Sequence, residues 1–208
     1  MLKKKAKAED NGAPVTDASG ESAKKQASGE RATSFLYEVV SVFITAFLIL
    51  AITFTFIMRF IGVMGQSMED TLHSGDWVFI QQAGSYTPQY GDVVVISQPN
   101  KYHENIIKRV IATEGQTIDI DFSTGKVYLD GAEIVEPYIK NDTTNYYDVK
   151  FPLTVPDGCC FVMGDNRQGS VDSRSSIIGV INNSYVLGKA GYALTDNGIT
   201  DLDLYRRK

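Results

Sequence analysis

The sequence predicts a mainly β domain carried on a single N-terminal transmembrane helix. The twenty residues from Val39 to Met58 contain no charged side chain. A helix of that length spans roughly 30 Å, the thickness of the hydrocarbon core of a bilayer. After residue 61, short runs rich in β-branched and aromatic residues alternate with turn signals, and no helical periodicity of any length follows. The chain therefore divides into a tail (residues 1–34), an anchor (35–60) and a β domain (61–208).

The tail is dominated by Lys, Ala, Ser, Gly, Glu and Asp and holds almost no large apolar side chain. Such a composition buries too little apolar surface to offset the entropy that is lost on ordering. We therefore expect residues 1–34 to be disordered.

The apolar segment differs from both a cleaved secretory signal and a buried core helix. A cleaved signal has a shorter apolar region, roughly 7–15 residues, followed by small residues. Here Arg59, Phe60 and Ile61 follow instead. A buried core helix would be interrupted by a polar face, and this run has none. The sequence therefore predicts an uncleaved anchor.

The orientation of the anchor is predicted from its flanking charges. Basic residues are concentrated before it, and only Arg59 occurs after it until Lys101. The positive-inside rule therefore places the N-terminus in the cytoplasm and residues 61–208 outside the cell membrane. The basic residues before the anchor are Lys3, Lys4, Lys5, Lys7, Lys24, Lys25 and Arg31.

The β domain is predicted from short runs separated by turn signals such as Gly-Asp and Asp-Gly. Because its last residues, Asp196–Lys208, are polar, we expect them to be loosely held. The predicted strands are Asp76–Ile80, Asp92–Ile96, Ile106–Ile111, Thr117–Ile120, Lys126–Leu129, Cys159–Met163 and Tyr185–Leu194.

The composition argues against several classes of function. A formal net charge of -5 does not fit a nucleic-acid binder, which usually carries a basic stripe. The two cysteines, Cys159 and Cys160, are adjacent, so they form neither a disulfide framework nor a zinc site. The two histidines, His73 and His103, are too few and too isolated for a histidine metal site. We expect no metal and no nucleic-acid partner.

Ser67 lies just after the anchor, between small and apolar neighbours in the stretch Gly65–Leu72. Serine hydrolysis needs a nucleophile, a base that takes its proton, and donors for the oxyanion. The usual base is a histidine supported by a carboxylate. His73 and His103 instead have the surroundings of a solvated turn residue and a loop residue.

Lys108 is an alternative base because it lies in an apolar strand. The alternation of a strand places Lys108 on the face of Ile106 and Val110, and Arg109 on the opposite face. One of the two basic residues is therefore carried to the buried face. Burial disfavours the ammonium form and can lower a lysine pKa from roughly 10.4 towards 8. An edge strand protected by charges is the other interpretation, and this stretch alone favours it.

Taken together and in this order, these stretches resemble the type I signal peptidases, membrane proteases with a Ser-Lys pair. Ser67–Leu72 is similar to the family's Ser-Met-x-Pro-Thr-Leu box, and Gly91–Val95 to its Gly-Asp-aliphatic box. Lys108–Ala112 matches the lysine box. Gly164–Arg174 matches Gly-Asp-Asn-Arg-x-x-Ser-x-Asp-Ser-Arg at all fixed positions. The resemblance covers Phe35 to about Ala190 and implies a signal-peptidase-like β domain of the short, Gram-positive type.

The resemblance implies a role for each matched residue. Ser67 would be the nucleophile and Lys108 the general base. Ser170 would orient the lysine amine through a hydrogen bond, and Asp172 and Arg174 would form an ion pair that braces the site. The backbone N–H of Ser67 would donate to the oxyanion, and no cofactor would be needed.

Two positions depart from the family pattern. Gly65 stands where many members have a serine whose hydroxyl donates to the oxyanion, so that donor is missing or replaced by backbone or water. Asp70 stands where the family has proline. Because proline fixes φ at roughly −65°, its loss should loosen the turn after the nucleophile.

The resemblance also implies the substrate. The family cleaves secretory preproteins after a small residue with another small residue two positions before it, usually Ala-x-Ala. The signal peptide would bind in an extended form beside the sheet, at the outer face of the lipid bilayer. Gly65, Met68 and Ile107 would contact it, the last two in shallow apolar pockets.

Two other interpretations compete with this one. A self-cleaving repressor or mutagenesis protein has a similar Ser-Lys β domain, but such proteins are soluble, and the segment Val39–Met58 argues against this interpretation. A membrane-anchored binding module with a degenerate protease motif would have lost Ser67 or Lys108, and both are present.

Overall fold

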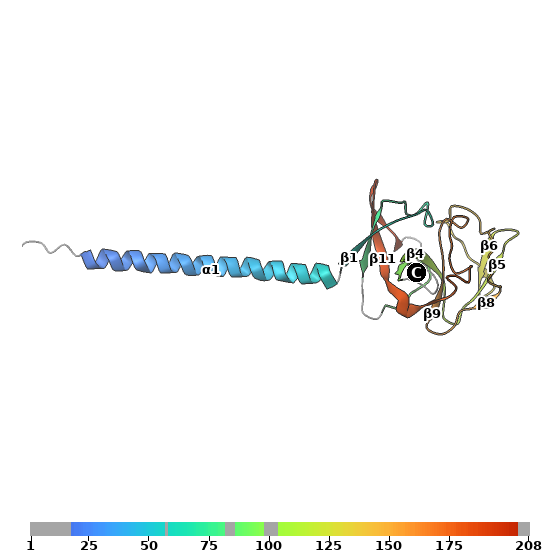
Figure 1. The fold of residues 1–208 in the computed structure, drawn as a ribbon, viewed down its shortest axis with the longest axis horizontal. Coiled ribbons are helices and arrows are strands. Elements are labelled where there is room, and N and C mark those ends of the chain that lie inside the picture. Colours follow the sequence, from blue (N-terminus) through green and yellow to red (C-terminus); the bar gives the residue numbers. More distant parts are fainter. Residues whose placement is uncertain (1–17, 57, 82–85, 98–103, 204–208) are drawn as a thin grey trace, which may run out of the picture. The chain divides into compact units, whose positions relative to one another are not determined.

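The computed structural model describes residues 18–56, 58–81, 86–97 and 104–203 (Figure 1). The chain forms two compact units that divide after Leu50. The first contains most of one long helix, and the second contains the strands.

The helix α1 runs from Ala18 to Phe56, a length of 39 residues. Within it, Ser34–Thr53 is long and apolar enough to cross a membrane. Large side chains along this part, among them Phe43 and Phe47, are exposed to the surroundings. Because exposing such side chains to water is unfavourable, this segment fits a membrane anchor.

The start of α1 differs from the predicted disorder of residues 1–34. The helix already includes residues 18–34, which are rich in the strong helix formers Ala, Glu, Lys and Gln. Adding such residues to an existing helix needs no new nucleation step, so the apolar segment extends the helix backwards. The rest of the predicted tail, residues 1–17, lies outside the described residues.

Most strands of the second unit form one curled antiparallel sheet in the order β1-β2-β11-β3-β4-β9-β10, with β12 paired to β11. A short 3₁₀ helix, Asn183–Tyr185, precedes β11. The strands are β1 (Met58–Gly62), β2 (Trp77–Gln81), β3 (Val93–Ile96), β4 (Ile106–Thr113), β9 (Cys159–Met163), β10 (Ile181–Asn182), β11 (Val186–Thr195) and β12 (Gly198–Asp201).

A smaller antiparallel sheet has the order β7-β6-β5-β8. It is built from β5 (Thr117–Asp121), β6 (Lys126–Leu129), β7 (Ala132–Glu133) and β8 (Leu153–Thr154). It lies beyond β9 in Figure 1. One buried cluster joins the two sheets, because Ile111 and Phe161 of the larger sheet pack with Ile118 and Val127 of the smaller one.

A second buried cluster positions the segment between β1 and β2. Met68 and Leu72 of this segment pack against Val78 of β2, Val95 of β3 and Ala190 of β11. The burial of these apolar side chains fixes the course of the chain on either side of Ser67.

The mainly β prediction is confirmed, and the seven predicted runs correspond to observed strands with ends that shift by one or two residues. The prediction for Met58 is wrong, because this residue opens β1 rather than closing the apolar helix. The expectation of a loose C-terminal end is wrong for part of Asp196–Lys208. There β12 pairs with β11, and Leu202 is buried in the core.

Candidate active site

Ser67 lies in a tight turn between β1 and β2. The turn is closed by two backbone hydrogen bonds, from Leu72 N to Met68 O (2.8 Å) and from Glu69 N to Gln66 O (3.2 Å). The loop after β9 holds it from the other side. Asn166 N donates to Ser67 O, and Asn166 Nδ2 donates to Gln66 O, each at 3.1 Å. Ser67 is thus fixed by segments about a hundred residues apart in sequence.

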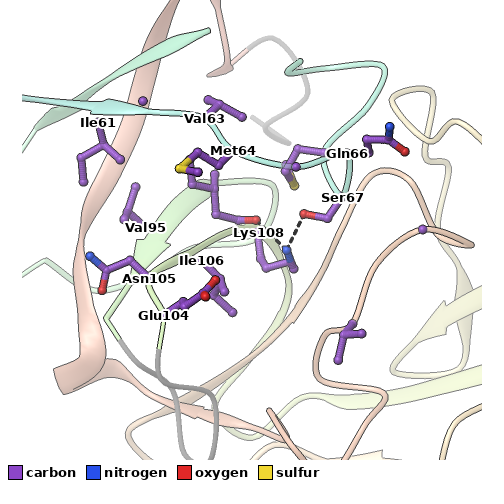
Figure 2. A pocket seen from close by; sticks show the side chains of 16 residues that line it. Ile61, Val63, Met64, Gln66, Ser67, Val95, Glu104, Asn105, Ile106 and Lys108 are labelled. Carbon is purple, nitrogen blue, oxygen red and sulfur yellow. Dashed lines mark hydrogen bonds between the residues drawn. The ribbon is translucent and has the colours of Figure 1, made fainter. Parts of the chain in front are cut away.

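Lys108 lies on β4 and pairs with Val94 of β3, so its side chain is carried into the domain, where only 3% of the residue is exposed. Its Nζ donates to Ser67 Oγ at 2.6 Å and to Ile107 O at 3.0 Å (Figure 2). The two side chains are therefore close enough for direct proton transfer.

The surroundings of Lys108 lower its pKa and so shift the amine towards its neutral form. Burial is the main cause and lowers the pKa of Lys108 from 10.5 to about 8. Asp172 and Asp165 act in the opposite direction, since negative charges favour the ammonium, and Arg174 lowers the pKa further. A substantial fraction of the amine is therefore unprotonated in mildly alkaline solution.

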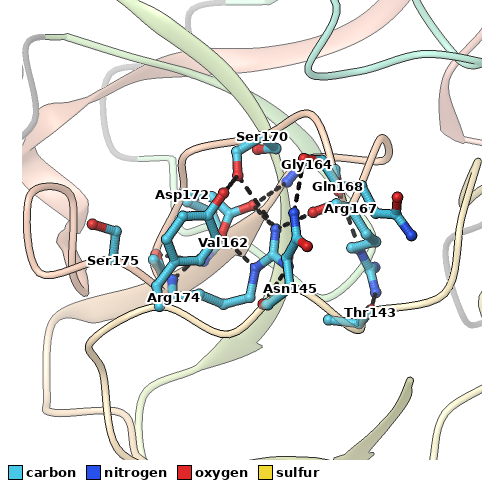
Figure 3. Close-up of polar contacts among 12 residues, drawn as sticks. Thr143, Asn145, Val162, Gly164, Arg167, Gln168, Ser170, Asp172, Arg174 and Ser175 are labelled. Atoms are coloured by element: carbon cyan, nitrogen blue, oxygen red, sulfur yellow. Dashed lines mark hydrogen bonds and ion pairs between the residues drawn. The ribbon is translucent and has the colours of Figure 1, made fainter. Parts of the chain in front are cut away.

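Asp172 and Arg174 form a fully buried ion pair with two contacts (Figure 3). Arg174 Nε donates to Asp172 Oδ1 at 2.8 Å, and Nη2 donates to Oδ2 at 2.9 Å. Burial alone would raise the pKa of Asp172, but the hydrogen bonds from Arg174 hold it below its usual value. Asp172 therefore stays ionised, with its charge balanced by Arg174 rather than by Lys108.

Ser170 packs close to the nucleophile around Gly164. A side chain at Gly164 would place its Cβ 2.3 Å from both Ser170 Oγ and Ser67 O, so only glycine fits here. The predicted hydrogen bond between Ser170 Oγ and the Lys108 amine is not formed. The amine donates to Ser67 and to the Ile107 carbonyl instead. The Ser170 hydroxyl is buried and faces Asp172 instead, where it helps to hold the pKa of that carboxyl below its usual value.

A cavity of about 710 Å³ opens beside the Ser67–Lys108 pair. Residues 61–68 line one side and residues 104–108 the other, as Figure 2 shows. Val95, Gly169 and Val171 complete the lining. The lining mixes apolar side chains with the polar side chains of Gln66, Glu104 and Asn105, so the cavity can contact both the side chains and the backbone of a peptide.

The strand that carries Lys108 has an open edge beside this cavity. On one side, Ile106, Ile107 and Lys108 pair with β3. On the other side, the pairing with β9 begins only at Arg109. Within the described part of the chain, no strand pairs with this side of Ile106–Lys108. A short backbone edge is therefore available to an extended peptide.

Comparison with known proteins agrees with this geometry. The profile of the family described as signal peptidase, peptidase S26, matches residues 36–194, which include the turn at Ser67, the strand of Lys108 and the loop of Arg174. The chain belongs to this family. It is therefore a peptidase of the signal peptidase I class, which decides against the repressor and the binding module.

Two signal peptidases from Bacillus species are similar in sequence to this chain. The peptidase is 32% identical to signal peptidase I of Bacillus licheniformis over 166 residues, 76% of this chain and 87% of that one. It is 33% identical to signal peptidase I T of Bacillus subtilis (strain 168) over 140 residues, 62% of this chain and 70% of that one. A crystal structure of a signal peptidase I from Enterococcus faecalis V583, 28% identical, covers 50% of this chain and 97% of that chain with a TM-score of 0.42.

The predicted substrate-contacting residues all line the cavity of the peptidase. Gly65 lies beside the nucleophile with a φ of 91°, a conformation that suits glycine. Met68 is largely buried in the core, and Ile107 is half-buried. His73 is exposed, lies in a turn near Asp76 and does not line this cavity. His103 lies outside the described residues.

The prediction for Arg109 is only half right. Arg109 does point away from Lys108, but its face of β4 is also buried, and the residue is 0% exposed. Both faces are covered because the smaller sheet packs over this side. The guanidinium is paired there with Asp165 through contacts of 2.9 and 2.7 Å, and it lies 4.1 Å from the ring centre of Tyr138.

Asp165 is a residue of the site that the sequence reasoning missed. Besides Arg109 of β4, it accepts a hydrogen bond of 2.5 Å from Thr71, in the turn of the nucleophile. It therefore connects the strand of the proposed base with the turn of the proposed nucleophile. The sequence signal was its place in the Gly164–Arg174 motif, but the motif does not reveal which distant residues Asp165 contacts.

Proposed function

We propose that this chain is a membrane-bound serine endopeptidase that removes N-terminal signal peptides from exported preproteins. In this proposal Ser67 is the nucleophile and Lys108 the general base. The observation that carries the assignment is the 2.6 Å hydrogen bond between Ser67 Oγ and a buried lysine whose pKa is lowered to about 8. Membership of the family supplies the substrate class.

The proposed reaction has two halves. Neutral Lys108 takes the proton of Ser67 Oγ while the oxygen attacks the scissile carbonyl, and the ammonium then gives its proton to the leaving amine. An ester between Ser67 and the signal peptide remains. Lys108, neutral again, takes a proton from water while the water oxygen attacks the ester carbonyl. The bond between that carbon and Ser67 Oγ then breaks, the signal peptide leaves with a new carboxyl group, and the Lys108 ammonium returns its proton to Ser67 Oγ. Every step uses protein groups and water, without a cofactor.

The backbone N–H of Ser67 is the oxyanion donor that we propose. It donates to no group among the described residues, so it is available to the developing negative charge. Gly65 has no hydroxyl to offer as a second donor, which leaves the backbone or water for that role.

The remaining motif residues would support the lysine. The ion pair of Asp172 and Arg174 keeps a full negative charge from acting on Lys108, and so keeps its pKa low. The hydroxyl of Ser170 lies beside Asp172 in this packed region and would accept an N–H of Lys108 once the amine is protonated during the reaction.

The open edge of β4 supports an extended substrate. A signal peptide would pair with Ile106–Lys108 and bring its scissile carbonyl to Ser67. Met68 and Ile107 would line shallow pockets for small side chains, in agreement with an Ala-x-Ala preference.

The domains and topology remain part of the proposal. Residues 1–34 would lie in the cytoplasm, residues 35–60 would be the anchor, and residues 61–208 would be extracytoplasmic. The apolar stretch Ser34–Thr53 and the flanking charges support this arrangement. Protease added to intact spheroplasts should digest the β domain and spare the tail, whereas access to Lys3–Arg31 from outside would reverse the topology.

Incubation of the detergent-solubilised protein with a secretory preprotein tests the function. We expect a shorter product whose new N-terminus directly follows an Ala-x-Ala sequence. Replacing the last alanine of that sequence with a bulky residue should prevent cleavage. A preprotein left intact by the wild type, or cleaved without regard to that alanine, would contradict the proposal.

The pH dependence tests the lysine assignment. Because Lys108 must be neutral, kcat/KM should rise with pH through a pKa near 8, with roughly a tenth of the enzyme active at pH 7. Arg174→Ala should move this rise to higher pH, since the freed Asp172 carboxylate favours the ammonium. The measurement is a pH–rate profile on a soluble signal-peptide mimic. A wild-type rise centred near the histidine value of roughly 6.5 would count against Lys108.

A further inference from the structure

Lys140 lies outside the cavity, yet it contacts the two residues that come two and three positions after the nucleophile. Its Nζ is 2.8 Å from Glu69 Oε2 and 3.5 Å from Asp70 Oδ1. Its backbone N donates to Asp165 O at 3.0 Å. Lys140 thus connects Glu69 and Asp70, in the turn that follows Ser67 (the nucleophile turn), to the loop after β9 that also holds Ser67.

The segment around Lys140 is itself held rigidly. Arg167 binds Glu136 through contacts of 2.7 and 2.5 Å and Thr143 through a contact of 2.6 Å. Arg167 and the side chain of Glu136 are almost fully buried. These bonds fix the chain on both sides of Lys140. The Lys140 ammonium therefore contacts the nucleophile turn from a rigidly held segment.

We propose that Lys140 is a positioning residue that acts through Glu69 and Asp70 to hold Ser67 within hydrogen-bond distance of Lys108. The inference rests on the proposed function and adds a residue to it. A proline at position 70 would restrict the turn covalently, but the aspartate here has no such restriction. The ionic contacts of Lys140 supply a restraint at the same place.

The size of the effect follows from the geometry of the reaction rather than from stability. Lys140 is 37% exposed in its side chain, and exposed ion pairs contribute little to the free energy of unfolding. Displacing a reacting atom by about 1 Å can nevertheless reduce turnover roughly a hundredfold. Loss of Lys140 should therefore reduce kcat far more than it reduces thermal stability.

The chain offers a matched control in Lys126. Its Nζ is 2.9 Å from Glu133 Oε2, and both side chains are about half exposed. This pair lies on β6 and β7 of the smaller sheet and contacts no residue of the site. Lys126→Met removes one surface ion pair of 2.9 Å, and Lys140→Met removes a pair of similar length together with the longer contact to Asp70. Only the contacts of Lys140 adjoin the turn of Ser67.

The experiment compares kcat, KM and the thermal unfolding temperature of both variants in the full-length solubilised protein. We expect Lys140→Met to lower kcat about tenfold with KM and the unfolding temperature nearly unchanged. Lys126→Met should match the wild type. Lys140→Arg should retain most of kcat, and the exchange Glu69→Lys with Lys140→Glu should be more active than either single variant. High salt should slow the wild type and leave Lys140→Met unaffected.

Three outcomes would overturn the role of Lys140: a kcat equal to that of Lys126→Met, a defect confined to KM, or no recovery in the exchanged pair. The proposed function is judged separately in the same assay. It requires turnover by the wild type that Ser67→Ala abolishes, whereas the role of Lys140 depends only on ratios to that turnover.

Discussion

We expect Lys108→Met to abolish processing while the β domain stays folded. Methionine has nearly the length of lysine and is apolar, so it should fill the same buried space without an amine to desolvate. Loss of a general base reduces turnover by about 10²–10⁴-fold. Ser67→Ala should be at least as severe, because it removes the atom that forms the ester.

The double variant distinguishes a catalytic pair from two independent contributions. Residues that act as a unit are not additive, so Ser67→Ala with Lys108→Met should be no slower than the worse single variant. Lys108→Arg should also be inactive, because a guanidinium stays protonated and cannot accept the serine proton. Turnover is measured as initial cleavage rate of a preprotein, and folding by thermal unfolding.

Two results would contradict this mechanism. Substantial turnover by Ser67→Ala would exclude the nucleophile. Activity retained in Lys108→Met but lost in His103→Ala would make histidine the base.

The largest effect on stability is expected from Asp165→Ala. This change leaves Arg109 buried without its carboxylate and leaves the Thr71 hydroxyl without its acceptor. Breaking a buried ion pair by removing one partner lowers the free energy of unfolding by about 3–5 kcal/mol. We expect a correspondingly large fall in the midpoint of denaturant-induced unfolding of the solubilised protein.

Lys126→Ala is the control for Asp165→Ala, because its ion pair with Glu133 is exposed and should contribute less than about 1 kcal/mol. Asp165→Asn should lie between the two, since an amide oxygen can still accept a hydrogen bond from Arg109. If Asp165→Ala unfolds at the same denaturant concentration as Lys126→Ala, then the buried pair does not stabilise the domain.

Local sequence was sufficient to predict the strands that have a clear pattern of apolar residues and turns. Val93–Ile96 is wholly aliphatic and bounded by a Gly-Asp turn, so strand propensity and burial agree. Local sequence was insufficient to predict β1 and β12. Met58, which opens β1, continues the apolar run of the anchor, and Gly198–Asp201 contains only one apolar side chain. Those strands form because β2 and β11 offer them backbone partners, which a sequence does not display.

The grouping of the candidate site residues was predictable where these residues lie in short motifs. Ser67, Lys108, Asp172 and Arg174 lie in such motifs, and the structure brings all four together. The contacts between the motifs were not predictable. The link from Asp165 to Thr71 spans 94 positions and that from Lys140 to Glu69 spans 71, and no local pattern reports a pairing over such distances.

The open edge of β4 also bears on which proteins can be cut. An unpaired strand edge can recruit any other exposed edge, including that of a folded protein. Here the edge is only Ile106–Lys108, and residues 61–68 face it across the cavity. In the proposed mode of binding, a substrate reaches this edge as a single extended chain lying between residues 61–68 and the edge. Under the proposed function, the recess would protect folded regions of a substrate from cleavage and would restrict attack to segments that are still unfolded.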